Sequence, residues 1–173
     1  MAQPFFSGSF FPGPMFGWAF SAVLFGLLAV AAYQDLKRVI VPKWITLPTL
    51  ALGILFNLVR GGWVEASGGG VWSGFLFALA GFGTGFGLFL LMWLLGTCGG
   101  GDVKLFAALG AWVGPLLCVF ILGCTIILVV LQLVTLAVAG RKVNKRRLTY
   151  SLPAALVTVV VLLWVFRGEL HLA

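Results

Sequence analysis

Two aspartates, Asp35 and Asp102, are the residues whose placement in this sequence suggests chemistry. The chain of 173 residues has only four acidic residues, against eleven lysines and arginines. Each aspartate lies at the end of a long apolar run, and Asp102 directly follows Gly99-Gly100-Gly101. A carboxylate close to hydrocarbon is energetically costly, so both acids require an explanation.

Two neighbouring carboxylates are able to hydrolyse a peptide bond. They share one proton, because like charges a few ångström apart do not both ionise easily. The charged acid then accepts a proton from water while the neutral acid polarises the peptide carbonyl. The only histidine is His171 near the C-terminus, and the cysteines Cys98, Cys118 and Cys124 lack C-x-x-C spacing. We therefore predict no serine or cysteine nucleophile, no metal and no cofactor.

A simpler interpretation of each acid is a solvated loop residue or a helix cap. Asp102 could be the N-cap of a following helix, and Asp35 could pair with Lys37 or Arg38. The three glycines before Asp102 argue against a cap alone, because each is about 1 kcal/mol worse than alanine in a helix. Glycine also permits positive φ and the close approach of another chain. We therefore expect a cleft that admits an extended peptide beside Asp102.

The elements that must position these acids are membrane helices. The sequence is 62% hydrophobic and has a mean hydropathy of +1.17, and a span needs roughly 20 apolar residues. We predict an all-α polytopic bundle of about six transmembrane helices, a single domain over residues 1–173, with an interfacial lead-in at 1–15. The expected spans are 16–34, 44–59, 71–95, 103–113, 116–139 and 151–166, with Gly114-Pro115 separating the fourth from the fifth. In the third span, Gly81, Gly83, Gly85 and Gly87 are expected to pack against other helices.

Basic residues fix the expected orientation. Nine of the eleven fall in three loops on one side: Lys37, Arg38, Lys43, Lys104 and the five in 141–147. The positive-inside rule then predicts a multi-pass protein of the cytoplasmic (inner) membrane with both termini outside and both aspartates at the cytoplasmic face. Since these loops account for the net charge of +7, we predict contact with membrane lipid and no nucleic-acid partner.

The motif Gly99-Gly100-Gly101-Asp102 resembles the G-x-G-D motif of intramembrane aspartyl proteases. With Lys104 after it, and with Asp35 ahead of a basic stretch and Pro42, the chain resembles the type IV prepilin peptidase family. Its size is similar to the short members that serve Flp/Tad-type pili, often called the CpaA or TadV group.

The resemblance implies that Asp35 and Asp102 are the catalytic pair, at the end of the first helix and the start of the fourth. It implies supporting roles for Gly99, Gly101, Lys104 and Pro42. It also implies that the substrates are prepilins or pseudopilins, cut between leader and hydrophobic helix at the cytoplasmic face.

Two features depart from the family pattern. Lys43 stands where the family's first motif usually has asparagine, which affects a loop contact rather than the acid. Larger members also carry a cysteine-rich cytoplasmic domain and methylate the new amino terminus. This sequence shows no such domain, so we predict peptidase activity without N-methylation.

Two other functions fit part of the pattern. A small proton-coupled transporter would use Asp35 and Asp102 as relay groups, although both acids are predicted at one face rather than at mid-membrane. A non-enzymatic assembly subunit would tolerate Asp102→Asn. Lys104 is either an anchor that extends to the interface or a charge that tunes Asp102.

Overall fold

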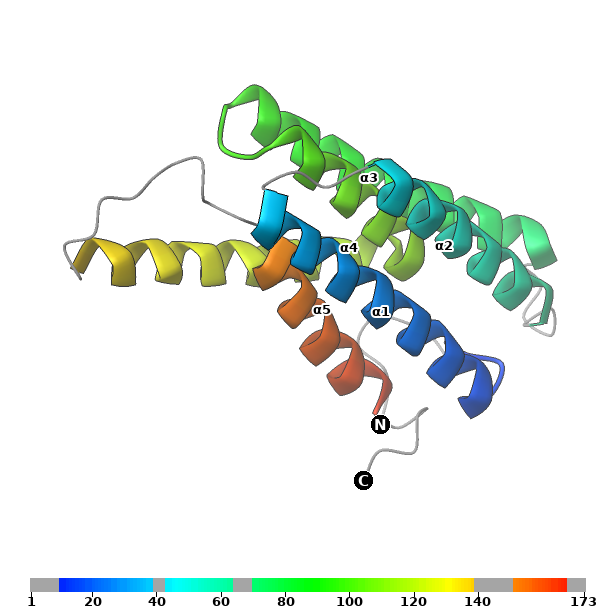
Figure 1. The fold of residues 1–173 in the computed structure, drawn as a ribbon. Helices are drawn as coiled ribbons and strands as arrows, with labels where there is room; N and C mark the ends of the chain where they lie inside the picture. The colour runs from blue at the N-terminus through cyan, green and yellow to red at the C-terminus, as the bar shows by residue number, and fades with distance from the viewer. Residues whose placement is uncertain (1–9, 39–42, 64–69, 139–150, 168–173) are drawn as a thin grey trace.

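A computed structural model describes residues 10–38, 43–63, 70–138 and 151–167, and these residues form a bundle of helices (Figure 1). The helices are α1 (Pro14–Arg38), α2 (Lys43–Trp63), α3 (Gly70–Leu94), α4 (Gly100–Val138) and α5 (Ser151–Phe166). Over these ranges the chain forms no strand, and the predicted all-α architecture is confirmed. The contact between α3 and α4 is the most extensive in the bundle.

The first four helices are long and apolar enough to cross a membrane, and α5 is a shorter apolar helix. Exposed tryptophans lie near both ends of two of them, Trp44 and Trp63 on α2 and Trp72 and Trp93 on α3. These pairs are 19 and 21 residues apart, about 29 and 32 Å at 1.5 Å per residue, which matches a hydrocarbon core of about 30 Å. Tryptophan concentrates at membrane interfaces, so these residues mark the two levels.

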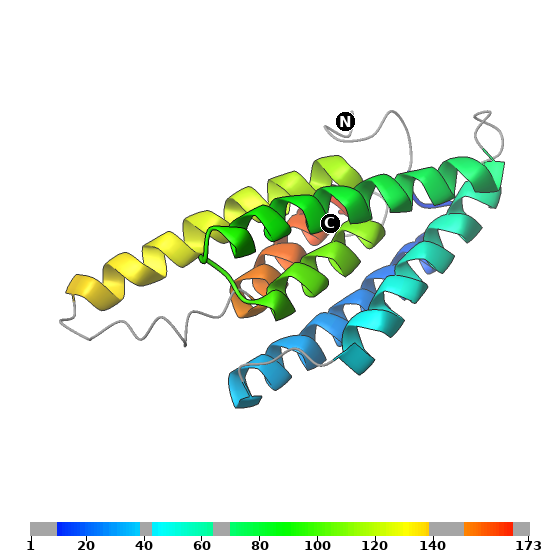
Figure 2. The ribbon, with the colours of Figure 1, turned by 90° about the horizontal axis from the view of Figure 1, so that it is seen from above.

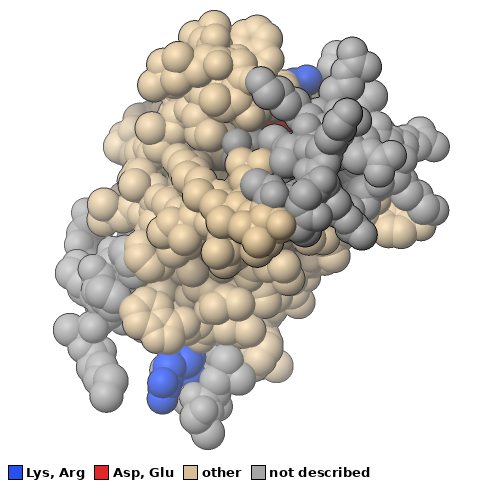
Figure 3. All heavy atoms as spheres, turned by 90° about the vertical axis from the view of Figure 1, so that its left-hand side faces the viewer, with Lys and Arg blue, Asp and Glu red and all other residues tan. Residues whose placement is uncertain are grey.

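The distribution of charge agrees with these two levels. On the face shown in Figure 3, the described lysines and arginines lie near two opposite ends, with uncharged surface between them. A belt of apolar side chains bounded by polar ends is what lipid requires of a spanning bundle. The chain is therefore a multi-pass membrane protein.

Helix α4 is broken at Gly114, where φ is 78° and ψ is 176°, directly before Pro115. A Cβ placed on Gly110 would lie 3.3 Å from Sγ of Cys118, whereas eight residues of straight helix would separate these positions by about 12 Å. The helix therefore folds back on itself, as Figure 2 shows. With segments 100–113 and 115–138 counted separately, the described residues form six helical segments, divided where the sequence predicted.

The turn at Gly114 lies within the depth of the membrane. A Cβ on Gly114 would collide with the ring of Phe77 on α3, and a Cβ on Gly81 would come within 2.8 Å of the Gly114 Cα atom. Phe77 and Gly81 are five and nine residues from Trp72, so the turn lies about 8 to 14 Å inside that interface along α3. Segment 100–113 thus does not reach the far interface.

Asn57 on α2 satisfies the backbone of this turn. Pro115 has no N–H, so the carbonyl of Ala111 loses its helical donor, and the break removes the donor for Trp112 as well. The Asn57 amide nitrogen donates to both carbonyls, at 2.9 Å to Ala111 and 3.1 Å to Trp112. Non-helical backbone inside a membrane requires such partners, because each unsatisfied group costs several kcal/mol in hydrocarbon.

An aromatic cluster closes the same end of the bundle. The Arg60 guanidinium lies 4.2 Å from the ring centroid of Phe10 and 4.5 Å from that of Phe77, and its Nε donates to Oδ1 of Asn57 at 3.1 Å. Phe10 and Phe11 are buried, although the sequence placed them in an interfacial lead-in. Arg60 attracts the negative face of the Phe10 ring, and Phe11 packs edge-to-face on Phe10 with ring centroids 5.0 Å apart, which holds the described end of the lead-in in the bundle.

Small residues on α3 allow close contact with α4. Gly81 and Gly85 are buried, and a Cβ at either would collide with backbone carbonyls of α4. At Gly83 and Gly87, an added Cβ would have no atom of another described segment within 4 Å, so these two glycines do not pack. The expectation of packing is therefore confirmed for two of the four glycines and wrong for the other two.

Candidate active site

Asp102 lies in the first turn of α4. The Gly99 carbonyl accepts the N–H groups of Asp102 at 3.1 Å and of Val103 at 3.4 Å, which makes Gly99 the N-cap. Asp102 is therefore the third helical residue and not the N-cap, which corrects one of the interpretations drawn from the sequence. Its Oδ2 accepts the N–H of Gly99 at 3.1 Å, the carboxylate half of a capping box.

The surroundings of Asp102 support a negative charge in a buried place. The side chain is only 8% exposed, which in a soluble helix is uncommon for a carboxylate. The N–H donated by Gly99 and the positive end of the α4 dipole both stabilise the ionised form. The hydrogen bond also holds one carboxylate oxygen in a fixed position at the end of the helix.

Cys98 is a neighbour of Asp102 that the sequence analysis assigned no role. Its Sγ lies 3.6 Å from the carbonyl oxygen of Phe89. Burial raises the pKa of the Cys98 thiol to about 11, and the negative charge of Asp102 contributes in the same direction. Cys98 is therefore a neutral thiol at physiological pH. The sequence signal for this neighbour of Asp102 was the position of Cys98 directly before the glycine run.

The glycine run is helical from Gly100 onward. Gly100 and Gly101 belong to the first turn of α4, and the positive φ in this region is at Gly96, with φ 71°. The positive φ that these glycines permit is therefore not used beside Asp102, and the close approach of another chain stays a prediction. A Cβ on Gly100 would lie 3.9 Å from Nε1 of Trp93, an ordinary contact, so the described surroundings leave room on this side of the helix.

Asp35 lies in the last turn of α1, three residues before its end at Arg38. The side chain of Asp35 and the whole of Pro42 lie outside the described residues. Figures 1 and 2 both show the C-terminal end of α1 and the N-terminal end of α4 at the same end of the bundle. The two helix ends that carry the aspartates are thus on one side.

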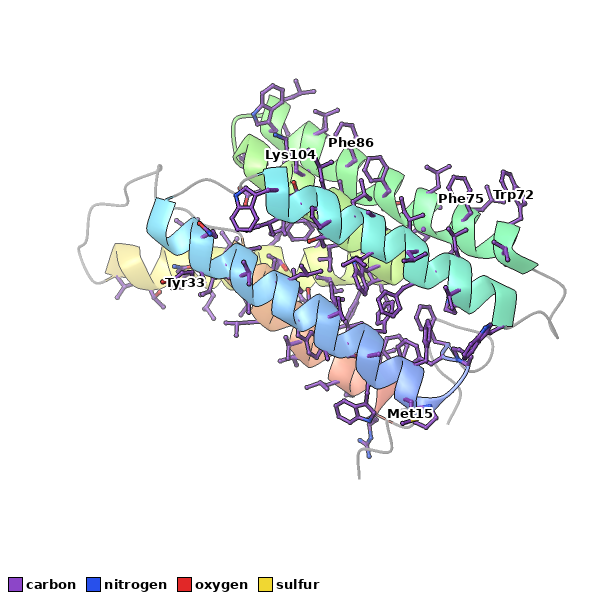
Figure 4. The ribbon with its side chains drawn as sticks, turned by 45° about the vertical axis from the view of Figure 1, so that its right-hand side comes forward. Met15, Tyr33, Trp72, Phe75, Phe86 and Lys104 are labelled. Atoms are coloured by element: carbon purple, nitrogen blue, oxygen red, sulfur yellow. The ribbon has the colours of Figure 1, made fainter. Side chains whose placement is uncertain are left out.

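Lys104 is exposed and lines a groove formed with α2 and α3 (Figure 4). It follows Asp102 by two residues, and helical positions i and i+2 do not face each other. Asp102 is buried while Lys104 is exposed, so the two side chains leave the helix on different faces. This geometry favours the interfacial anchor over a direct charge on the acid.

Within the described ranges, no three His, Cys, Asp or Glu side chains are grouped so as to hold a metal ion. What the segment around Asp102 offers is one charged oxygen acceptor, a neutral thiol and an uncrowded glycine turn. A carboxylate of this kind is suited to proton transfer.

Residues 22–134 match the model of the type IV leader peptidase family, which is more than half of the chain and includes both aspartates. The chain belongs to this family. Two relatives named "Prepilin leader peptidase/N-methyltransferase" illustrate the match. The protein from Aeromonas hydrophila is 37% identical over 103 residues, and that from Pectobacterium carotovorum subsp. carotovorum is 37% identical over 98 residues.

The matched regions cover 57% and 53% of this chain, but only 33% and 32% of the two relatives. The chain thus aligns with about a third of the length of these curated proteins. No solved structure matched the chain. The comparisons show the family, and the fold shows the membrane bundle. The chemistry of the site is inferred from the geometry of Asp102 described above.

Proposed function

We propose that this protein removes the N-terminal leader of type IV or Flp-type prepilins and pseudopilins at the cytoplasmic face of the inner membrane. The observation that carries the proposal is Asp102, buried at the N-terminus of α4 with its carboxylate held by Gly99. Asp35 ends the helix that finishes at the same end of the bundle. The name of the relatives supports prepilins as the substrate class.

The proposed reaction is hydrolysis by a pair of aspartates. Asp102 is the charged member, because the Gly99 N–H and the helix dipole support its charge, and it accepts a proton from water. Asp35 is the neutral member and gives its proton to the peptide carbonyl oxygen as hydroxide adds to the carbon. Collapse of this intermediate breaks the C–N bond: the leaving nitrogen receives the proton from Asp102, and the hydroxyl that becomes the new carbonyl returns its proton to Asp35, which restores both acids.

The N-methyltransferase part of the relatives' name is not carried over to this chain. The alignment covers only about a third of each relative. We propose that the new amino terminus leaves the enzyme unmethylated. Mass spectrometry of the processed product tests this, since methylation would add 14 Da, about one CH₂ group.

The decisive experiment uses the purified full chain in lipid nanodiscs with a prepilin, and follows loss of the leader by gel shift. Asp35→Asn and Asp102→Asn are each expected to reduce cleavage by about 10²- to 10⁴-fold while the protein still inserts. Glu65→Gln and Glu169→Gln make the same change of carboxylate to amide at the two remaining acids and should cleave normally.

The double aspartate variant should be no worse than either single variant, because groups that act as a unit are not additive. Substantial cleavage by either single variant rejects the aspartate pair. Failure of the wild-type protein to process any prepilin rejects the function itself.

The orientation is tested by reporters. With both termini outside, a cytoplasm-active reporter fused after Ala173 stays silent, and one inserted at Asn144 is active. The reverse pattern would place the aspartates on the wrong side of the membrane for prepilin leaders.

A further inference from the structure

A narrow apolar furrow runs along the outside of the bundle between α2 and α3 and ends at Lys104. It consists of two adjoining hollows, of about 230 Å³ and about 130 Å³, which share Leu50 and Phe82 as walls. In Figure 4, Lys104, Phe86 and Phe75 follow one another along this edge. The remaining walls are almost entirely hydrocarbon: Leu47 and Ala107 beside Lys104, and Ile54 and Leu79 farther along.

Among the described residues that form these walls, Lys104 alone is charged. It is exposed and makes no hydrogen bond or ion pair with any residue in the described ranges. Asp102, the nearest acid in the sequence, is buried on another face of the same helix turn. The mouth of the furrow therefore carries a positive charge that no described side chain neutralises.

The depth of Lys104 suits the head of a lipid. A Cβ on Gly100 would lie 3.9 Å from Trp93, one of the tryptophans that mark the interface, and Lys104 is one turn, about 6 Å, farther along α4. A lysine stem extends over such a distance and brings the ammonium group to the level of the lipid phosphates.

We propose that this furrow binds one anionic phospholipid, with its phosphate on the Lys104 ammonium group and an acyl chain along Leu50 and Phe82. An extended hydrocarbon chain is thin enough to enter both hollows in succession. The net charge of +7 adds a general attraction to anionic lipid.

The lipid site does not depend on the proposed peptidase activity. Asp102 takes no part in it, and its test measures lipid and not cleavage. A prepilin helix is the competing occupant, and the experiment below includes it as an outcome.

The test uses the full chain in phosphatidylcholine nanodiscs with a trace of photoreactive lipid, a diazirine on the acyl chain of either phosphatidylglycerol or phosphatidylcholine. Mass spectrometry then maps the labelled peptides. We expect phosphatidylglycerol to label the peptides containing Leu50 and Phe82 about fivefold more than phosphatidylcholine, which is the preference that one lysine gives. Excess inorganic phosphate should not reduce the labelling, because the acyl chain supplies much of the binding.

Three variants assign the effect. Lys104→Gln should remove the preference for phosphatidylglycerol, and Lys104→Arg should keep it. Arg167→Gln removes one exposed charge away from the furrow and should keep the preference as well. Leu47→Trp fills the hollow without changing the charge and should lower labelling by both lipids.

Equal labelling by the two lipids in the wild-type protein overturns the proposal, as does a preference that Lys104→Gln retains. Labelling that concentrates instead in the hollow between α4 and α5, beside Cys124 and Val157, also overturns it. Displacement of the lipid label by an added prepilin would assign the furrow to the substrate.

Discussion

The two ends of the first segment of α4 are built in opposite ways. At the Gly114 end every side is filled: Phe77 covers the glycine, Trp112 is fully buried, and Asn57 satisfies the turn. At the Asp102 end the helix begins at the exposed glycines Gly99 and Gly100, whose added Cβ atoms would make only ordinary contacts. These ends are 12 residues apart, about 18 Å along the helix.

This contrast separates the residues that hold the helix in place, around Gly114, from the residues of the proposed active site, around Asp102. The closed end fixes the position of the helix because interiors at full packing density tolerate little change. The open end keeps space around a fixed carboxylate, as a site that must admit a peptide requires. Substitutions at the closed end should therefore lower stability, and substitutions at the open end should lower activity.

The largest effect is expected for Gly114→Ala. The backbone of Gly114, with φ 78° and ψ 176°, lies in a region used almost only by glycine and costs about 1–3 kcal/mol for a residue with a Cβ, and the collision with Phe77 adds about 1–3 kcal/mol of overpacking. Thermal unfolding in detergent should show this loss. Gly83→Ala is the control, because its Cβ meets nothing and the change should be neutral or slightly stabilising. Equal stability of the two variants would mean that the turn is not fixed as described.

Gly101→Ala should have the second largest effect, and on activity alone. Alanine favours the helix by about 1 kcal/mol, so stability should not fall. If the peptide approaches the backbone beside Asp102, the added methyl group displaces it, and a shift of about 1 Å costs on the order of 10²-fold in rate. Prepilin cleavage at matched protein levels measures this. Gly100→Ala should be milder, and near-normal cleavage by both would show that the glycine run is not part of the substrate site.

Asn57→Ala should destabilise the closed end by about 1–3 kcal/mol, because the carbonyls of Ala111 and Trp112 lose their donor. Thr158→Ala is the matched control. Its hydroxyl donates to a carbonyl of its own helix, Ala154 at 2.7 Å, so less should be lost. If Asn57→Ala lowers the free energy of unfolding by less than Thr158→Ala in the same measurement, the Asn57 amide does not stabilise the turn as described.

The smallest effect concerns the thiol at the open end. A pKa near 11 instead of 9.0 leaves about 100-fold less thiolate at pH 8, so alkylation of Cys98 should be slow and rise as the pH approaches 11. Burial is the main cause, and the charge of Asp102 is the second. Asp102→Asn should therefore lower the pKa of Cys98 and speed alkylation by less than about tenfold. An unchanged rate would mean that Asp102 is not charged there.

The sequence was sufficient for the helices and for the break in α4. Pro115 lacks the backbone N–H and Gly114 lacks a side chain, so both disfavour a continuous helix at this position. The uncharged stretch 105–139 contains no other proline. The sequence also marks Asp102 as a candidate, since a membrane-length chain with four acids leaves few others. The catalytic roles of Asp102 and Asp35 stay predictions, and the side chain of Asp35 and the whole of Pro42 lie outside the described residues.

The wrong predictions concern residues whose role depends on the helical face or turn that they occupy. Glycines at 81, 83, 85 and 87 are equivalent in composition, yet only 81 and 85 continue the face of Gly74 and Ala78, so only these meet α4. The alternative interpretation of Asp102 as an N-cap was misplaced by three residues, because the sequence does not show where the first turn begins. Asn57 and Phe10 contact partners that are distant in the sequence. Asn57 donates to Ala111, 54 residues away, and Phe10 packs against Arg60, 50 residues away, so a local sequence pattern reveals neither contact.

The short first segment of α4 has a consequence for biogenesis. Its 14 residues measure about 21 Å, below the length at which a segment partitions into lipid as an independent span, and its last carbonyls depend on Asn57 from α2. We therefore expect residues 100–138 to enter the membrane as a paired hairpin and not one helix after another. Because α2 is synthesised before α4, we expect the Asn57 amide, which donates to the carbonyls of this hairpin, to reach the membrane first.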